Sequence, residues 1–270
     1  MNTIKKVNIG CGKRHDKSWI NIDFSSSSPD IIQYDLNKGI PFEDNSVDVV
    51  YNSHVLEHFS NKQGNFLLSE CYRVLKKGGI IRVAVPDLES ICKEYLKQLE
   101  IAVANNANQN YDWIVLELFD QMVRNTSGGE MKKFILNNNE NMLAYINSRM
   151  GQEAIQIRGN SKSAAISKTK NRFKNVFILE KWYDLFLKVM LTKKYKNYLE
   201  IGKFRQNGEI HQWMYDRYSL KKMLESYGFY NVVSRTASDS LILDWKNYNL
   251  DSDDGGDPHK PDSLFMEAEK

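Results

Sequence analysis

The chain has 270 residues, 41% of them hydrophobic, and a formal net charge of +3. This length and composition allow one large domain, or a domain with an insertion, built around a real hydrophobic core. The mild charge gives no general attraction for nucleic acid, and no run of about 18 apolar residues is present to span a bilayer. Three cysteines without a C-x-x-C pair favour the reducing cytoplasm, with peripheral membrane contact left open.

Short β-branched runs alternate with turn residues from residue 5 to about residue 96, which is typical of a mostly parallel α/β sheet. Strands are expected within 7–12, 19–23, 33–36, 47–51 and 80–87. One amphipathic helix is expected over 64–76, where Gly78 and Gly79 would end it. Its apolar stripe would pack on the sheet through Phe66, Leu67, Cys71, Val74 and Leu75.

Segments rich in asparagine and lysine, with helical periodicity, follow between 98 and 208 and predict a helical insertion. Between Arg158 and Arg205, lysine and arginine far outnumber the acids, and this local excess favours an anionic partner. The polar stretch 161–174 is expected to be a mobile loop. An apolar stripe over 177–204 fits the core of the insertion or, alternatively, a membrane surface.

The alternating pattern returns after residue 208, with a helix expected over 219–227, closed by Gly228, and strands at 230–235 and 263–269. The chain therefore divides into a core (1–97), a helical, basic insertion (98–208) and a segment that completes the sheet (209–270). An acidic loop at 251–257 lacks the spacing of an EF-hand and is expected to be a solvated hairpin connection.

Polar groups that suit a nucleoside follow the expected strands. Gly10 and Gly12 lack side chains, so their backbone can approach a ligand, although a third glycine of the dinucleotide pattern is missing and NAD is disfavoured. The short spacing to Asp23 leaves little room for a crossover helix. Asp23 can accept hydrogen bonds from ribose hydroxyls, and Asp35 with Leu36 suits adenine. Both carboxylates have an alternative role as caps of helices or turns.

The ordered motifs within 5–96 resemble class I S-adenosylmethionine (SAM)-dependent methyltransferases. They include Asn-Ile-Gly-Cys-Gly (8–12), Trp-Ile-Asn-Ile-Asp (19–23), His-Val-Leu-Glu-His (54–58) and Arg-Val-Leu-Lys-Lys-Gly-Gly (73–79). More narrowly, they look like a bacterial branch often found with glycan and secondary-metabolite genes. The resemblance implies a Rossmann-like, seven-stranded sheet whose last strand is antiparallel, with SAM at the carboxyl ends of the strands.

The same resemblance implies roles for individual residues. Gly10 and Gly12 would lie beneath the methionine part, Asp23 at the ribose, and Asp35 and Leu36 at adenine. Residues after the fourth strand, Asn52, Ser53 and His54, would lie near the sulfonium.

The run 54–58 also fits the H-x-x-E-H pattern of zinc hydrolases, but its place directly after a strand in this series argues against that reading, and no metal ligands are assigned. A sugar hydroxyl must lose its proton to become a good nucleophile, and imidazole has a suitable pKa. His54 is therefore the first candidate for a general base, and His211 the second. Glu57 and His58 have a plainer interpretation as hydrogen-bonding residues at a helix start.

Further polar and aromatic residues are candidates for acceptor binding. Arg124 would pair with an anionic substrate, or alternatively form an interhelical ion pair. Close to His211 stand Trp213, Tyr215 and Arg217, a mixture typical of a site rim. The alternative is that Trp213 belongs to the core while Asp216 caps the next helix.

The sequence thus predicts a SAM-dependent O-methyltransferase of a sugar, glycan, or nucleotide- or phosphate-linked sugar, with S-adenosylhomocysteine as product. Two alternatives stay open: N- or O-methylation of a natural product, and a non-catalytic SAM-binding partner subunit. Nucleic acid is not an expected partner, because the positive charge lacks interleaved aromatic residues. The oligomeric state is not predicted.

Overall fold

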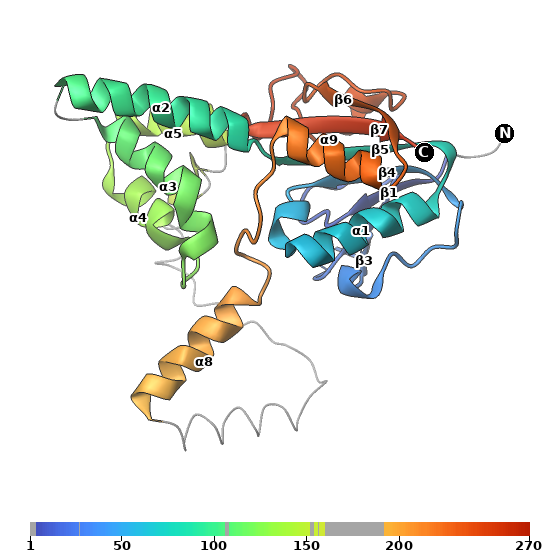
Figure 1. The fold of residues 1–270 in the computed structure, drawn as a ribbon, viewed down its shortest axis with the longest axis horizontal. Coiled ribbons are helices and arrows are strands. Elements are labelled where there is room, and N and C mark those ends of the chain that lie inside the picture. Colours follow the sequence, from blue (N-terminus) through green and yellow to red (C-terminus); the bar gives the residue numbers. More distant parts are fainter. Residues whose placement is uncertain (1–3, 27, 106–107, 152–153, 156, 160–191) are drawn as a thin grey trace.

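The fold is seen in a computed structural model that describes residues 4–26, 28–105, 108–151, 154–155, 157–159 and 192–270 (Figure 1). A seven-stranded sheet has the order β3-β2-β1-β4-β5-β7-β6. The first five strands are parallel, and β7 runs antiparallel to both β5 and β6. This confirms the predicted Rossmann-like α/β fold with an antiparallel last strand.

Most strands lie where alternation predicted them, but the third, expected at 33–36, lies earlier and ends at Gln33, and the fifth begins before the predicted 80–87. Their bounds are β1 (Lys6–Ile9), β2 (Ile20–Asp23), β3 (Ile31–Gln33), β4 (Val47–Ser53), β5 (Leu75–Pro86), β6 (Tyr230–Arg235) and β7 (Ser263–Glu269). No helix lies between β1 and β2, as their short spacing predicted. The glycine loop therefore passes directly from the carboxyl end of one strand to the start of its neighbour.

Helix α1 (Asn61–Val74) begins and ends earlier than expected. Ser60 and Gln63 form a capping box, in which each side chain bonds the backbone N–H of the other, and this fixes the start before Gly64. At its end the chain passes from Val74 directly into β5, so Gly78 and Gly79 lie inside that strand instead of stopping the helix. The predicted stripe was also wrong at one position, because Phe66 is 42% exposed while Leu68 is buried.

The remaining helices are α2 (Leu88–Asn105), α3 (Gln109–Val123), α4 (Gly129–Asn137), α5 (Glu140–Met150), α8 (Lys193–Arg205) and α9 (Arg217–Ser226). Within the described part of 98–208, all regular elements are helices. The predicted boundary at residue 97 falls inside α2. The predicted loop at 161–174, and most of the predicted basic region and apolar stripe, lie outside the described residues.

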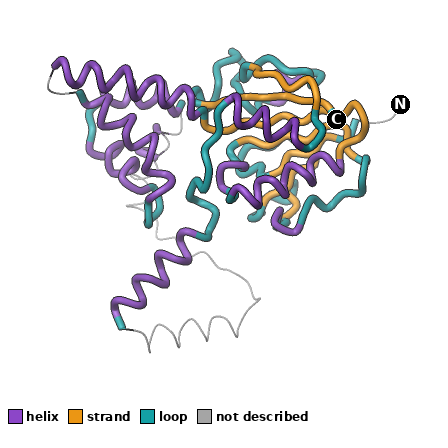
Figure 2. Tube along the Cα trace, in the orientation of Figure 1, coloured by secondary structure: helices purple, strands orange, loops and turns teal. Residues whose placement is uncertain are grey.

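Helices α2 to α5 form a cluster beside the sheet where β5 ends, and α8 projects away from both, with its last residue, Arg205, donating to the Met122 and Arg124 carbonyls at the end of α3 (Figures 1 and 2). The cluster has its own core, in which Trp113 packs with residues such as Met131, Ile135 and Ile146. No residue of α8 is buried. No helix in the described part of the chain is both long enough and apolar enough to cross a bilayer.

The two faces of the sheet are covered differently. Helices α1 and α9 pack on one face (Figure 1). On the other face, the long connection between β6 and β7 packs Trp245 and Leu250 against Trp19 and Tyr51.

The acidic loop at 251–257 belongs to this connection, and its first residue does not behave as predicted. Asp251 is buried and accepts hydrogen bonds from the Tyr51 hydroxyl (2.5 Å) and from Nε of Arg82 (2.8 Å). The loop was predicted to be solvated, which is correct for Asp253, Asp254 and Asp257 and wrong for Asp251. The Asp251 carboxylate thus anchors the β6–β7 connection to the sheet.

Candidate functional site

The first of three neighbouring cavities lies at the ends of β1, β2 and β3, and we name it the strand-end cavity. Its volume is about 490 Å³. Four residues predicted to bind the cofactor line it together: Gly10, Asp23, Asp35 and Leu36. Gln206, Asn207 and Gly208, which follow α8, contribute to its wall.

Both carboxylates of this cavity also have local structural roles. Asp23 Oδ2 accepts a hydrogen bond from the Gly12 amide (2.9 Å), and Oδ1 accepts one from the Ser25 amide (2.9 Å). Asp35 caps the short helix η1 (Leu36–Lys38) by accepting from the Asn37 amide. The alternative role in caps and turns therefore applies to both Asp23 and Asp35, which also line the cavity.

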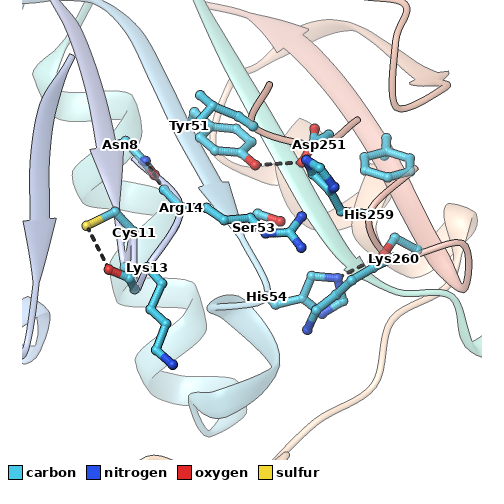
Figure 3. Close-up of a pocket in the computed structure, with 15 residues that line it drawn as sticks. Asn8, Cys11, Lys13, Arg14, Tyr51, Ser53, His54, Asp251, His259 and Lys260 are labelled. Carbon is cyan, nitrogen blue, oxygen red and sulfur yellow. Dashed lines mark hydrogen bonds between the residues drawn. The ribbon is translucent and has the colours of Figure 1, made fainter. Parts of the chain in front are cut away.

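The second cavity, which we name the loop cavity, has a volume of about 360 Å³ and lies between the glycine loop and the end of the β6–β7 connection. Gly10, Gly12 and Ser53 line it, together with the cations Lys13, Arg14 and Lys260. In Figure 3, Arg14 reaches across the cavity toward the side that carries His259, whereas Lys13 points away from its centre.

Burial and the nearby Asp23 charge raise the pKa of the Cys11 thiol, in the same loop, to about 11. This thiol is therefore protonated at neutral pH and is a poor nucleophile.

The third cavity, named the histidine cavity, has a volume of about 210 Å³. It is lined by residues from the turn after β4, from the helical cluster and from the segment after α8, namely His54, Glu57, His58, Arg124, Glu209, His211, Lys260 and Asp262 among others. His54 is the residue that lines all three cavities.

His54 is held from both sides of its ring. Its Nδ1 lies 3.1 Å from Glu57 Oε1, and its Nε2 lies 2.8 Å from the Ser263 hydroxyl. Its backbone has φ of +54°, an uncommon conformation for a residue with a side chain, and its amide donates to the Ala84 carbonyl (2.9 Å). The end of β4 thus turns sharply and directs the imidazole to the point where the cavities meet.

Glu57, in the 3-10 helix η2 (Leu56–His58), is fully buried behind His54. Burial works to raise the pKa of this carboxyl, but the His54 hydrogen bond and the neighbouring imidazoles outweigh it and lower the pKa to about 2. An ionised Glu57 fixes the proton of His54 on Nδ1 and leaves Nε2 as the basic atom. Glu57 and His58 end the short helix η2 and do not start α1, but they make the polar contacts that the plainer interpretation predicted, and the Glu57 carboxylate also orients the candidate base.

The second candidate base, His211, is buried in the histidine cavity and stacks edge-on against His58, with 4.9 Å between ring centroids. Burial lowers the pKa of its imidazole to about 3. His211 is therefore neutral at physiological pH, and its proton affinity is low for a general base. The low proton affinity of His211 leaves His54 as the first candidate for the general base.

The residues predicted to bind the acceptor do not all come together. Arg124 lines the histidine cavity, where its guanidinium lies 3.3 Å from Glu209 Oε1. Trp213 is 44% exposed, so it does not belong to the core, and Tyr215 is buried in the main core. Arg217 pairs with Glu89 beside a different cavity, next to α2, and Asp216 caps α9 as its alternative role predicted.

Asn52 and Ser53 also occupy different positions. Ser53 lines the loop cavity. Asn52 is buried in β4, and neither polar atom of its side chain has a hydrogen-bond partner among the described residues. Asn52 lines none of the three cavities, so the structure does not bring it to the predicted cofactor site beside Ser53.

Several residues of the cavities escaped the sequence reasoning, among them Ser263, Lys260 and Asp262. All three lie at or just before β7, more than 200 residues from His54 in the chain. The signal that could have found them is the antiparallel pairing of β7 with β5, which brings Ser263 opposite Pro86 at the carboxyl end of β5.

Comparison with known proteins gives one family match. Residues 8–83 match the model of a methyltransferase domain. This segment contains β1 to β4, α1 and most of β5. The match, together with the strand order, supports the class I fold, the methyltransferase class and the SAM cofactor predicted from the sequence.

Individual relatives are more distant. A probable S-adenosylmethionine-dependent methyltransferase of Mycolicibacterium smegmatis is 48% identical over 48 residues, which are 18% of this chain and 18% of the relative. The chain thus matches less than a fifth of that relative's length.

Two solved structures are similar over the whole chain. A SAM-dependent methyltransferase from Archaeoglobus fulgidus has a TM-score of 0.39 and 12% identity, over 100% of this chain and 87% of the other. A phosphoethanolamine N-methyltransferase of Haemonchus contortus has a TM-score of 0.38 and 12% identity, over 100% of this chain and 49% of the other.

Proposed function

We propose that the protein transfers a methyl group from SAM to a hydroxyl oxygen of a small anionic acceptor, with a sugar or a phosphate- or nucleotide-linked sugar as the preferred class. The observation that carries this proposal is the position of His54 at the junction of three cavities, inside a segment that matches a methyltransferase domain. Each cavity then suits one part of the reaction.

The cofactor would extend from the strand-end cavity into the loop cavity. Asp23 and Asp35 offer carboxylates for the ribose and adenine, and the backbone of Gly10 and Gly12 offers close approach for the methionine part. Arg14 supplies a cation for the cofactor's carboxylate. The cofactor supplies an electrophilic methyl carbon and leaves as neutral S-adenosylhomocysteine.

His54 would act as the general base. With the His54 proton on Nδ1, Nε2 accepts a hydrogen bond from the Ser263 hydroxyl at 2.8 Å, so a hydroxyl fits at this atom. When an acceptor hydroxyl replaces Ser263 there, Nε2 takes its proton while the oxygen forms the new bond to the methyl carbon. Glu57 stabilises the imidazolium that results, because its carboxylate is ionised and lies 3.1 Å from Nδ1.

The acceptor would occupy the histidine cavity. Arg124 and Lys260 line it, beside the carboxyl groups of Glu57, Glu209 and Asp262, and these two cations would meet a phosphate or carboxylate on the acceptor. The cavity volume of about 210 Å³ suits a small acceptor or one part of a larger one.

A direct test begins with cofactor binding. Calorimetric titration with S-adenosylhomocysteine should give micromolar affinity for the wild type and for Asp30→Asn, whose carboxylate is exposed and lines none of the three cavities. Asp23→Asn should weaken binding at least tenfold, because it removes an ionised acceptor for the ribose hydroxyls. No binding by folded wild type, free of copurified cofactor, would overturn the proposal.

The second step tests the chemistry. Transfer of a labelled methyl group from SAM is measured on a panel of phosphorylated sugars, beside uncharged sugars and amine-containing natural products. We expect turnover on a phosphorylated sugar, and a loss of turnover of roughly 100-fold or more in His54→Asn, larger than any change in S-adenosylhomocysteine affinity that results because His54 also lines the cofactor cavities. Cofactor binding without turnover on any acceptor would instead indicate a non-catalytic SAM-binding subunit.

A further inference from the structure

The histidine cavity contains a cluster that general-base catalysis by His54 leaves unexplained. Glu57, His58 and His211 each point one ligand-type atom inward, and these atoms all lie within 4.8 Å of one another. Two imidazoles and one carboxylate at such distances match the donor set of catalytic transition-metal sites, in which open positions are kept for water or substrate.

Hydrogen bonds orient His58 as they orient a metal ligand. Its Nδ1 lies 3.1 Å from the Ile210 carbonyl, to which it can only donate, and this places the proton on Nδ1. The lone pair is then on Nε2, the atom that lies 4.0 Å from Glu57 Oε1. A backbone carbonyl that fixes the tautomer of a ligating histidine in this way is a common feature of metal sites.

The backbone ties together the two segments that carry the cluster. The Glu57 carbonyl accepts from the amides of Gln212 (2.7 Å) and Trp213 (3.2 Å), and the Gln212 side chain donates to the His58 carbonyl (2.9 Å). The His211 amide donates to the Gln121 carbonyl (3.0 Å). The backbone segments that carry the three donors are therefore fixed to one another before any ion binds, and only side-chain shifts are needed to coordinate it.

Glu57 provides the independent sign of a missing ligand. Its side chain is fully buried, Oε1 faces His54, and Oε2 has no hydrogen-bond partner in the described part of the structure. An orphaned carboxylate oxygen at such depth is costly unless a cation or a donor satisfies it.

We propose that Glu57, His58 and His211 bind a divalent first-row transition ion, with Zn²⁺ as the reference case, and that its open positions face the histidine cavity. Imidazole nitrogens favour such ions over Mg²⁺ and Ca²⁺, which prefer oxygen ligands. The donors need to approach one another by about 1 Å, since Zn²⁺ binds nitrogen and oxygen at about 2.0–2.2 Å.

The charges around the cluster are compatible with a cation. The nearby Arg124 already faces the carboxylates of Asp120 and Glu209, at 3.9 and 3.3 Å. Lys260 lines the same cavity and opposes a cation, while the half-buried Asp262 adds a buried carboxyl oxygen, Oδ1, that lacks a hydrogen-bond partner among the described residues. This inference goes beyond the proposed function, because metal binding can be measured without cofactor or acceptor.

The test uses the full chain, stripped with EDTA and then titrated with Zn²⁺ by calorimetry and with Co²⁺ by visible absorption. We expect one ion per chain, with a Kd in the micromolar range or below, and no comparable binding of Mg²⁺. His58→Gln and His211→Asn should each weaken binding by at least roughly tenfold. His15→Gln serves as the matched control, since His15 lies outside the cluster, and it should bind as the wild type does.

Thermal unfolding in EDTA checks that each variant is folded, and His58, which is partly exposed, is the substitution expected to perturb the fold least. Absence of stoichiometric binding by the wild type overturns the proposal. So does equal affinity in His58→Gln and the wild type, or binding of Mg²⁺ as tight as that of Zn²⁺.

Discussion

At the scale of single residues, the glycine loop combines a backbone requirement with a packing requirement. Gly10 and Gly12 both have positive φ, +66° and +53°. A Cβ on Gly10 would lie 2.3 Å from a methyl carbon of the buried Val55, whereas one on Gly12 would meet nothing within 4 Å. The two positions therefore share a conformational cost but differ in the space available.

This difference leads to a paired prediction. Gly12→Ala should lose about 1 kcal/mol of unfolding free energy through its left-handed backbone alone. Gly10→Ala should lose about 3 kcal/mol, because the overlap with Val55 adds to that cost. Urea unfolding of both variants beside the wild type measures the difference, and equal losses would contradict the packing argument.

Cys11 allows a test of electrostatics in the same loop. Only the thiolate reacts with iodoacetamide, so with a pKa of about 11 the labelling rate should rise about tenfold per pH unit between pH 7 and pH 10. Asp23 helps to raise this pKa through its negative charge, so Asp23→Asn should lower the pKa and speed labelling at fixed pH.

Peptide mass spectrometry without cofactor follows the labelling of Cys11. Cys71 is the internal control, because it is fully buried and should stay unlabelled in both proteins. A labelling rate for Cys11 that does not respond to Asp23→Asn would show that access, not charge, limits its reactivity.

At the scale of elements, the β6–β7 connection is anchored through a buried arginine of β5. The Arg82 guanidinium is fully buried, pairs with Asp251 and Glu267 at 2.8 Å each, and donates to the carbonyls of Thr236 and Asp239. One side chain thus connects β5, β7 and the segment that covers the second face of the sheet.

Removal of this side chain should be costly. Arg82→Met removes the cation shared by two buried carboxylates, of which Glu267 keeps Arg235 and Asp251 keeps the Tyr51 hydroxyl, and should lower the free energy of unfolding by about 3–5 kcal/mol. The control is Lys76→Met, which breaks a pair with Asp48 that is 30–43% exposed and should cost less than about 1 kcal/mol. Denaturant unfolding compares the two, and similar losses would mean that the arginine is not the anchor of the connection.

Helix α1 illustrates which local signals are decisive in this sequence. The apolar periodicity correctly predicted a helix near 64–76. Its start is fixed by a capping box of Ser60 and Gln63, a local signal that periodicity does not contain. The end of the helix could not be predicted from Gly78 and Gly79, because both glycines lie inside β5. Element type was thus readable from periodicity, and boundaries depended on specific hydrogen bonds.

At the scale of the whole molecule, the part of the site built from neighbouring strand ends was predictable. Gly10, Asp23, Asp35 and Leu36 line one cavity because parallel strands bring their carboxyl ends to the same edge. The contacts of His54 with Ser263 and of Arg82 with Asp251 were not predictable, since the partners lie 209 and 169 residues apart. No local pattern encodes such pairs, and only the antiparallel placement of β7 and the path of its preceding connection create them.

The arrangement of the cavities predicts which segments of the chain cofactor binding will protect from hydrogen exchange. S-adenosylhomocysteine at 100 times its Kd should stabilise the folded chain by about 2.7 kcal/mol. Hydrogen exchange should slow in segments that line the strand-end and loop cavities, namely 10–14, 34–37 and 54–59, and also at 206–212, which follows α8. Helices α4 and α5 contribute nothing to these two cavities, so their amides should exchange as in the free protein. Protection confined to the sheet, without 206–212, would mean that the segment after the insertion does not close over the cofactor, and that the strand-end cavity is completed by other parts of the chain.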